Sequence, residues 1–262
     1  MWLVYRRGGL GDTLLTFPLL ELLKKQGRNV WAVGNTDYFA IAKAVGWADM
    51  VSSEVPEEGF EGRLIISFEG NIKPFPEKRL WLVEHYLQSA KLTGSFSKSL
   101  PLEPLPRSPL EGCVVLHPSS GSKKKNPPLE LYFMVEDFLK RQGYRTIYLV
   151  GEADSWLKAY VKNYWESHEP LEIARALKKA LLFVGNDSGL SHLASYCGLP
   201  TFVFYGPTDP VVWKPVGERV YQISLSLECS PCFPHVCEER ACLEPEAIFE
   251  RFLAVFRKAQ LL

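Results

Sequence analysis

The sequence predicts an α/β protein made of two domains, each built around a parallel sheet. Short apolar runs alternate with amphipathic segments along most of the 262 residues, as expected when helices join parallel strands. The alternation stops once, at a stretch that contains Pro101, Pro104, Pro106 and Pro109, and then restarts, which indicates a linker. Polar, glycine-containing turns follow several of the apolar runs, where such sheets carry their ligand-binding loops.

The elements before the linker form the first predicted domain, residues 1–108. In chain order we expect strand 2–5, helix 13–26, strand 30–33, helix 38–45, strand 64–68 and helix 79–92. The second domain, residues 109–245, repeats the pattern. It is expected to contain strand 113–117, helix 129–142, strand 146–150, helices 155–164 and 171–179, strand 181–184, helix 190–196 and strand 201–205. An amphipathic segment, 246–262, predicts a closing helix. Two such Rossmann-like domains would face each other across a cleft.

The composition of the chain argues against a nucleic-acid partner and a membrane-spanning segment. The chain has 30 basic and 30 acidic side chains and no net charge, so no basic excess exists to neutralise a nucleic-acid backbone, and nucleic acid is not an expected partner. Residues 1–7 lack the order of a signal peptide, and no run of about 18 apolar residues occurs. We therefore expect a cytoplasmic protein that associates at most weakly with a membrane surface.

The loop after the first strand combines glycines with a carboxylate. Gly9 and Gly11 let the backbone lie close to a ligand, and Asp12 falls at or near the start of the following helix. There the carboxylate could accept a proton from an attacking hydroxyl, or it could simply cap the helix. The dinucleotide-binding pattern GxGxxG is incomplete, because its third glycine is missing.

Two further loops carry groups suited to a nucleotide sugar. Residues 117–128 place hydroxyls, a glycine and three lysines just before a helix, which suits a diphosphate, although a solvated lysine turn is the plain alternative. Asp187, Ser188 and Gly189 place a carboxylate, a hydroxyl and backbone N–H groups at another helix start. That combination suits a sugar hydroxyl beside a phosphate, and an ordinary helix cap is the alternative.

The six cysteines divide into two groups. Cys113 and Cys197 lie in a predicted strand and at a helix end, which indicates buried, inert thiols. The others are Cys229, Cys232, Cys237 and Cys242. A single CxxC with two irregularly spaced partners leaves disulfides, free thiols and a structural metal site open. This cluster follows the last predicted strand, so we expect it to lie away from the strand-end loops and outside the active centre.

Taken together, these segments resemble glycosyltransferase family 9, the ADP-heptose:lipopolysaccharide heptosyltransferases. Gly11-Asp12 before an apolar helix looks like the family's N-terminal motif, and residues 125–128 look like its Lys-x-Trp-Pro loop, with Pro127 at the tryptophan position. Residues 187–194, 198–200 and 206–213 resemble its Asp-Ser-Gly-x-x-His-x-Ala, Gly-x-Pro and Gly-x-Thr-x-Pro-x-x-Trp motifs. The motifs occur in the family's order, and the cysteine segment resembles that of the family.

The resemblance implies a GT-B enzyme that inverts the anomeric centre and needs neither a metal nor another cofactor. The first domain would hold a lipopolysaccharide inner-core acceptor, and the second would hold ADP-heptose and release ADP. Asp12 would be the general base. Lys125, helped by Ser120 and Lys124, would neutralise charge on the departing ADP.

The resemblance also assigns the other donor-site residues. Asp187 would hold the donor sugar, while Ser188, Gly189 and Leu190 would bind the diphosphate with His192 one turn further on. Glu152 or Asp154 could bind the ribose. A lipopolysaccharide acceptor places the protein at the inner face of the inner membrane, against basic and aromatic side chains of the first domain. The candidates are Arg6, Arg7, Lys73, Lys78, Arg79 and Trp81, of which Arg6 and Arg7 could equally serve an anionic acceptor within the cleft.

Three other functions fit parts of the same pattern. A sugar-nucleotide epimerase would use the same cleft without an acceptor groove. A non-catalytic nucleotide-sugar binding protein would keep the ligand contacts without turnover. An interaction protein would use the cysteine cluster and the aromatic surface, and it would gain no stability from ADP.

Overall fold

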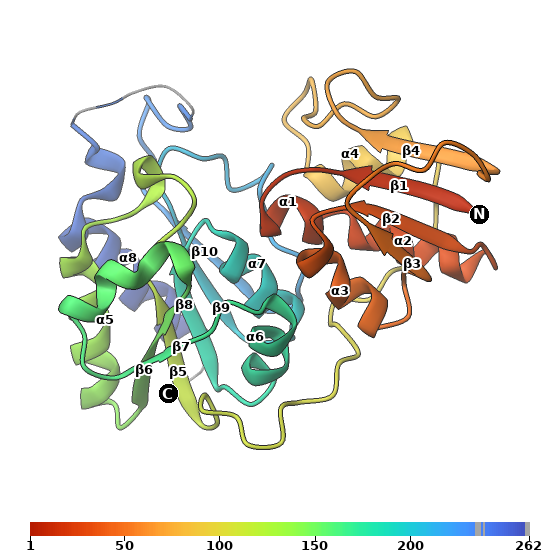
Figure 1. The fold of residues 1–262 in the computed structure, drawn as a ribbon. Helices are drawn as coiled ribbons and strands as arrows, with labels where there is room; N and C mark the ends of the chain where they lie inside the picture. Colours follow the sequence, from red (N-terminus) through yellow and green to blue (C-terminus); the bar gives the residue numbers. More distant parts are fainter. Residues whose placement is uncertain (234–236, 238, 260–262) are drawn as a thin grey trace.

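The computed structural model describes residues 1–233, 237 and 239–259, apart from the side chains of Glu152 and Ala153. It has an α/β architecture with two parallel sheets, each in its own lobe (Figure 1), as predicted from the alternation of apolar runs and amphipathic segments. Each sheet lies inside one of the two predicted domains, whose exact boundaries we retain as a proposal.

The N-terminal sheet has the strand order β3-β2-β1-β4, with parallel neighbours throughout. Its strands are β1 (Trp2–Arg6), β2 (Val30–Gly34), β3 (Met50–Ser52) and β4 (Gly62–Ile66). Its helices are α1 (Leu10–Leu14), α2 (Phe17–Lys25), α3 (Thr36–Ala44) and α4 (Leu82–Ser89). The single helix expected over 13–26 is two helices, because Pro18 has no N–H to continue a helix and instead occupies the first turn of α2.

The C-terminal sheet has the order β10-β9-β8-β5-β6-β7, again entirely parallel. Its strands are β5 (Cys113–His117), β6 (Arg145–Val150), β7 (Tyr164–Glu166), β8 (Leu182–Asn186), β9 (Thr201–Tyr205) and β10 (Val220–Ser224). Its α-helices are α5 (Leu129–Arg141), α6 (Pro170–Leu177), α7 (Gly189–Tyr196) and α8 (Pro245–Lys258). The helix expected over 155–164 is wrong: a 3-10 helix, Glu152–Ala159, leads to the edge strand β7.

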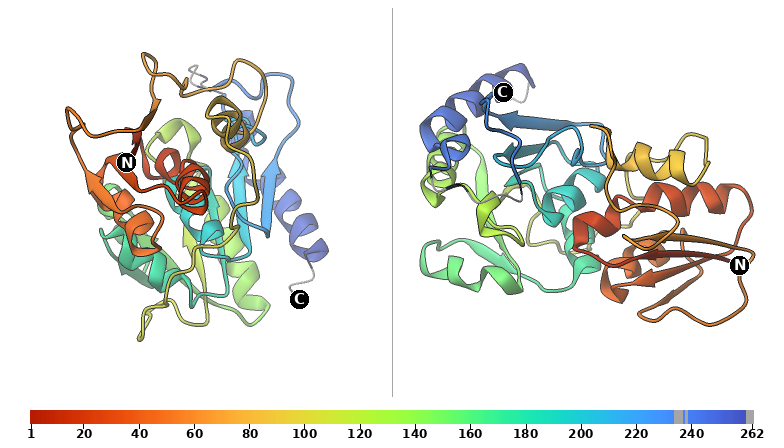
Figure 2. Two further views of the ribbon diagram at one scale, coloured as in Figure 1. Left: turned by 90° about the vertical axis from the view of Figure 1, so that its right-hand side faces the viewer. Right: turned by 90° about the horizontal axis from the view of Figure 1, so that it is seen from above.

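The closing helix forms as predicted and covers one face of the C-terminal sheet. Phe252 and Phe256 of α8 are fully buried and contact Phe138 of α5 and Phe202 of β9. Figure 2 shows α8 at the end of the molecule far from the N-terminal sheet. Residues 260–262, the end of the predicted segment, lie outside the described part. No helix among the described residues is long and apolar enough to span a bilayer.

The two lobes share one hydrophobic core. Phe17 and Trp47 of the N-terminal lobe pack against Tyr196 of α7, with ring centroids 6.2 and 5.9 Å away. Above this cluster the first turns of α1 and α7 touch. A Cβ at Gly189 would lie 2.8 Å from the Leu10 Cβ, and a Cβ at Gly11 would lie 3.0 Å from the His192 ring. A Cβ at Gly189 would therefore clash, and one at Gly11 would require the His192 ring to shift, so the two glycines permit this approach.

A second contact joins the lobes on the side of α4. Arg79 forms a two-point ion pair with Asp209, at 2.6 and 3.1 Å. The Trp81 indole donates to the Lys214 carbonyl at 2.6 Å. Both side chains are therefore engaged between the lobes, while the Arg79 side chain remains 62% exposed, and their contact with a membrane stays a prediction.

The glycine contact between α1 and α7 predicts a specific loss of stability. Gly189→Ala places a methyl group against the Leu10 Cβ, an atom that cannot swing away, and should lower the free energy of unfolding by about 1–3 kcal/mol. Urea unfolding measures this. Gly121→Ala, where the added methyl group meets nothing within 4 Å, is the control, and an equal effect of both substitutions would contradict the close approach.

Candidate active site

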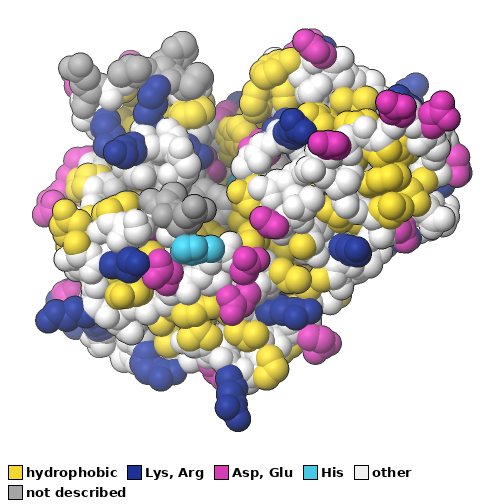
Figure 3. Space-filling view, in the orientation of Figure 1, with side chains coloured by type: hydrophobic (Ala, Val, Ile, Leu, Met, Phe, Trp, Pro, Cys, Tyr) yellow, Lys and Arg dark blue, Asp and Glu magenta, His cyan; other side chains and the backbone are white. Residues whose placement is uncertain are grey.

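A cavity of about 860 Å³ lies between the lobes, where strands of both sheets end. The space-filling view shows a notch between the lobes (Figure 3). In each sheet the chain places successive strands first on one side of a central strand and then on the other, at β1 in the N-terminal sheet and at β5 in the C-terminal sheet. Ligands of open parallel sheets bind at such points. The cavity brings together most of the residues singled out in the sequence. These are Gly9, Gly11, Asp12, Ser120, Lys125, Asp154, Asp187, Ser188, Gly189, Leu190 and His192.

Asp12 lies on the wall formed by the N-terminal lobe. It is the third residue of α1, and its Oδ2 accepts the N–H of the N-cap residue Gly9 at 3.0 Å. Its Oδ1 forms an ion pair with Arg6, whose side chain is only 7% exposed. Asp12 thus caps the helix from within its first turn and also faces the cavity. Each of its oxygens has a further lone pair for a ligand hydroxyl.

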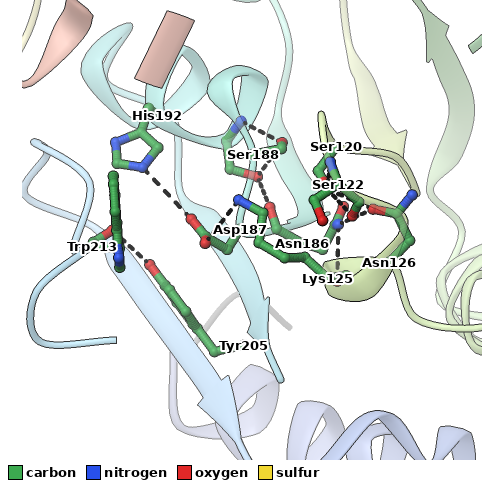
Figure 4. A network of polar contacts seen from close by, with 11 residues as sticks. Ser120, Ser122, Lys125, Asn126, Asn186, Asp187, Ser188, His192, Tyr205 and Trp213 are labelled. Carbon is green, nitrogen blue, oxygen red and sulfur yellow. Dashed lines mark hydrogen bonds and ion pairs between the residues drawn. The ribbon is translucent and has the colours of Figure 1, made fainter. Parts of the chain in front are cut away.

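Asp187 and Lys125 form an ion pair on the opposite wall (Figure 4). Lys125 Nζ lies 3.2 Å from Asp187 Oδ2, and His192 Nε2 lies 3.8 Å from Oδ1, which is an ion-pair distance and too long for a hydrogen bond. Burial alone would raise the pKa of Asp187, but His192 and Lys125 outweigh it and hold this pKa below its usual value. The carboxylate therefore stays charged at neutral pH.

Two asparagines fasten the loop of residues 117–128, called the lysine loop from here on, to the end of β8. Asn126 Oδ1 accepts hydrogen bonds from the Ser120 hydroxyl at 2.6 Å and from Asn186 Nδ2 at 2.9 Å (Figure 4). Asn186 also donates to the Lys125 carbonyl at 3.2 Å. These bonds hold Lys125 beside Asp187. Neither asparagine stood out in the sequence, although each is next to a motif residue.

Lys124 is directed elsewhere. It lines a second, smaller pocket with Lys123, Cys232, Cys237 and Cys242, and it is absent from the described lining of the main cavity. It belongs to the 3-10 helix Lys123–Lys125, and its help to Lys125 at the donor site stays a prediction.

The N-terminus of α7 opens into the cavity. Ser188 is its N-cap and accepts the Ser191 N–H at 3.3 Å. The backbone N–H groups in the first turn of a helix have no partner within the helix, so the turn at Gly189 and Leu190 can receive an anion. Trp213 also lines the cavity, and its carbonyl accepts the Tyr205 hydroxyl at 3.1 Å (Figure 4).

Asp154 is engaged within the protein. His117 Nε2 lies 2.9 Å from Asp154 Oδ2, and the Gly151 N–H donates to the same oxygen at 3.2 Å. Burial raises the pKa of Asp154, but the hydrogen bond and charge of His117 lower it to about 2. A ribose hydroxyl would have to share this carboxylate with His117. The side chain of Glu152, the other ribose candidate, lies outside the described part of the structure.

The cysteine segment returns to the strand-end loops, contrary to expectation. The Cys232 N–H donates to the carbonyl of Pro207, just after β9, at 2.8 Å, and Arg240 donates to the Asn126 carbonyl. This segment therefore supports the lysine loop, a long-range contact that sequence spacing does not reveal. Cys229, Cys232, Cys237 and Cys242 are free thiols. Among the described residues, no group of three or more potential ligands is arranged to hold a metal ion.

Two parallel sheets that face each other across a cleft, with helix N-termini at its walls, define the GT-B class of glycosyltransferase fold. Residues 97–243 match the family described as glycosyltransferase family 9 (heptosyltransferase), and the chain belongs to this family. The expected family and fold class are thereby confirmed.

Individual relatives agree with this assignment. Over 78 residues the chain is 30% identical to lipopolysaccharide heptosyltransferase 1 of Pseudomonas aeruginosa, a match that spans 30% of this chain and 22% of that protein. A family 9 glycosyltransferase from Veillonella parvula superposes with a TM-score of 0.74, at 16% identity, over 98% of this chain and 96% of that one. Heptosyltransferase WaaC of E. coli, solved with ADP, gives a TM-score of 0.68 at 17% identity, over 97% and 98% of the two chains. These two structures show the shared fold.

The Asp154–His117 pair predicts part of the acid sensitivity of the fold. Because the pKa of Asp154 falls from 3.8 to about 2 on folding, its stabilising contribution is complete above 3.8 and is lost as the pH falls toward 2. The contribution should be about 2 kcal/mol. Urea unfolding between pH 2 and 6, compared with Asp154→Asn, should show the smaller pH dependence for the variant.

The exposed Asp137, paired with Arg141 on the surface of α5, provides a matched control. Asp137→Asn should leave the pH dependence of stability nearly as in the wild type. Equal pH profiles for wild type and Asp154→Asn would contradict the pairing of Asp154 with His117.

Proposed function

We propose that this protein is an inverting glycosyltransferase that transfers heptose from ADP-heptose to a lipopolysaccharide inner-core acceptor. One observation carries the proposal: Asp12 on the N-terminal wall and Lys125, Asp187 and Ser188 on the C-terminal wall line a single cavity. The proposal is supported by the relatives, one named lipopolysaccharide heptosyltransferase 1 and another solved with ADP.

The proposed reaction is a direct displacement at the anomeric carbon of heptose. The acceptor oxygen forms a bond to this carbon on the face opposite ADP, while the bond between the carbon and the diphosphate oxygen breaks. The electron pair leaves with ADP, and the hydroxyl proton passes to Asp12. Arg6 and the Gly9 N–H hold the carboxylate in a fixed orientation for this transfer.

The donor would lie against the C-terminal lobe. The N-terminus of α7 and Lys125 supply positive charge for the diphosphate, so we propose that no metal ion or organic cofactor is needed there. Lys125 donates one of its three ammonium N–H groups to Asp187, and the other two can donate to phosphate oxygens. Asp187, still paired, would accept hydroxyl groups of the heptose.

A lipopolysaccharide acceptor would bring the enzyme to the inner face of the inner membrane. Arg7, Lys73 and Lys78 are exposed on the N-terminal lobe, and we propose that they give weak, salt-sensitive attraction to anionic lipid.

Lys125→Ala should weaken the binding of ADP, because the diphosphate loses a charge-assisted hydrogen bond worth about 1–3 kcal/mol. Isothermal titration calorimetry with ADP measures the change. Lys123→Ala is the control, since Lys123 belongs to the same short helix but lines the other pocket. Unchanged ADP affinity in Lys125→Ala would exclude the phosphate role.

Asp12→Asn should lower kcat about 10²–10⁴-fold, because the amide cannot accept the hydroxyl proton. ADP release from ADP-heptose with and without acceptor measures the rate, and acceptor-dependent release separates a transferase from an epimerase or a binding protein. The buried Arg6 would keep only a neutral oxygen as partner, so we expect a stability loss of about 1–2 kcal/mol.

The exposed Asp37, in the first turn of α3, is the matched control, and Asp37→Asn should keep the wild-type rate. ADP affinity of Asp12→Asn should also match the wild type, which shows that the donor site is intact. A near-normal kcat in Asp12→Asn would leave Asp12 with a capping role only.

A further inference from the structure

Three aromatic side chains form a row from the cavity to the outer surface. The ring centroids of Phe68 and Phe75 are 5.9 Å apart, and those of Phe75 and Trp213 are also 5.9 Å apart. The interplanar angles of 60° and 61° are close to edge-to-face packing. The row crosses from the segment after β4 to the loop after β9, so it spans both lobes.

The two outer rings of the row, those of Phe68 and Phe75, are exposed to solvent. Phe68 is 74% exposed and Phe75 is 44% exposed. Hydrophobic side chains border the notch on the N-terminal lobe (Figure 3). Single exposed aromatics are ordinary, but a contiguous apolar patch beside a cavity indicates a contact surface.

The row is continuous with the proposed active site. Phe75 and Trp213 line the same cavity as Asp12 and His192. Phe68 is the outer end of the row. A ligand bound at Asp12 could therefore extend along these three rings toward the surface.

The backbone around the row is held in place. Phe75 lies between Pro74 and Pro76, and the Pro74 carbonyl accepts the Tyr86 hydroxyl at 3.0 Å. Lys73 Nζ donates to the Phe68 carbonyl at 2.6 Å. A surface fixed before binding loses little entropy when a ligand arrives.

We infer that Phe68, Phe75 and Trp213 are a stacking surface for the saccharide units of the acceptor next to the one that reacts, an inference that rests on the proposed function. A sugar ring has one face of weakly positive C–H groups, which matches the negative face of an aromatic ring. The hydroxyl groups at the rim of the sugar can remain in water. An oligosaccharide acceptor thus suits a row of apolar rings that opens to solvent.

The charges beside the row are mixed, because the exposed Lys73 and Lys78 lie in the same segment as the exposed Glu69 and Glu77. Glu69 directly follows Phe68, and Glu77 follows Phe75 after Pro76. Carboxylates at these positions would be repelled by an anionic leaflet if the rings entered it. Insertion into lipid is therefore the competing outcome of the experiment.

The test uses Phe68→Ala and Phe75→Ala in the full chain. The acceptor probe is a heptose-deficient core oligosaccharide freed of its lipid, and ADP-heptose is the donor. We expect the KM for the oligosaccharide to rise about tenfold in Phe75→Ala and severalfold in Phe68→Ala. An ADP affinity equal to that of the wild type shows that each variant is folded. Phe133→Ala, which removes a 39% exposed ring from α5, should leave this KM unchanged.

An unchanged KM in both cleft variants overturns the inference. The inference is also overturned if Phe68→Ala loses binding to anionic phospholipid vesicles while its KM for the oligosaccharide is unchanged. That result would make the row a lipid contact. If the wild type transfers no heptose, the proposed function fails separately. Tryptophan fluorescence titration with the same oligosaccharide then decides: weaker binding by Phe75→Ala than by wild type supports the stacking surface, and absent or equal binding rejects it.

Discussion

The close approach of the α1 and α7 N-termini determines the geometry of the candidate site. Asp12 belongs to the first turn of α1, and Ser188 and His192 belong to α7, so one contact sets the distance between the two walls of the cavity. Gly11 and Gly189 permit the approach, and the shared core beneath it resists separation of the lobes. Because packed cores do not deform continuously, the position of the proposed base relative to the donor site is built into the fold.

Charge pairing keeps the polar groups of the cleft in place. Asp187 and Arg6 are almost fully buried, and a buried charge without a partner costs several kcal/mol. Lys125 compensates Asp187, and Asp12 compensates Arg6. The pairs add little net stability, since desolvation offsets most of the attraction. Their effect is to fix orientation, which is what a site for a diphosphate and a sugar requires.

Sequence alone predicted the central strands and the three loops that meet in the cavity, because burial on both faces makes central strands continuous apolar runs. It did not predict the edge strands β3, β7 and β10. They are short or half-exposed, so their apolar signal is weak. The division at Thr16 was also missed, although Pro18 was a visible sign of it.

The partners of the candidate residues were harder to predict than the residues themselves. Asp12 and Asp187 stood out by type and position in strand-end loops. His117 and Asn186 act through contacts between distant parts of the chain, which no local spacing encodes, and the pairing of Arg6 with Asp12 depends on how the loop between them turns. The return of the cysteine segment to the lysine loop, through Arg240 and Asn126, is a contact over more than a hundred residues and was likewise hidden.

A crystal structure of the protein with ADP-heptose tests the central claim most directly, because it locates both parts of the donor. We expect the diphosphate at Lys125 and the N-terminus of α7, the anomeric carbon facing Asp12 across the cavity, and the α1–α7 contact preserved. A diphosphate bound in the pocket of Lys123 and Lys124, or lobes separated at Gly11 and Gly189, would contradict the account.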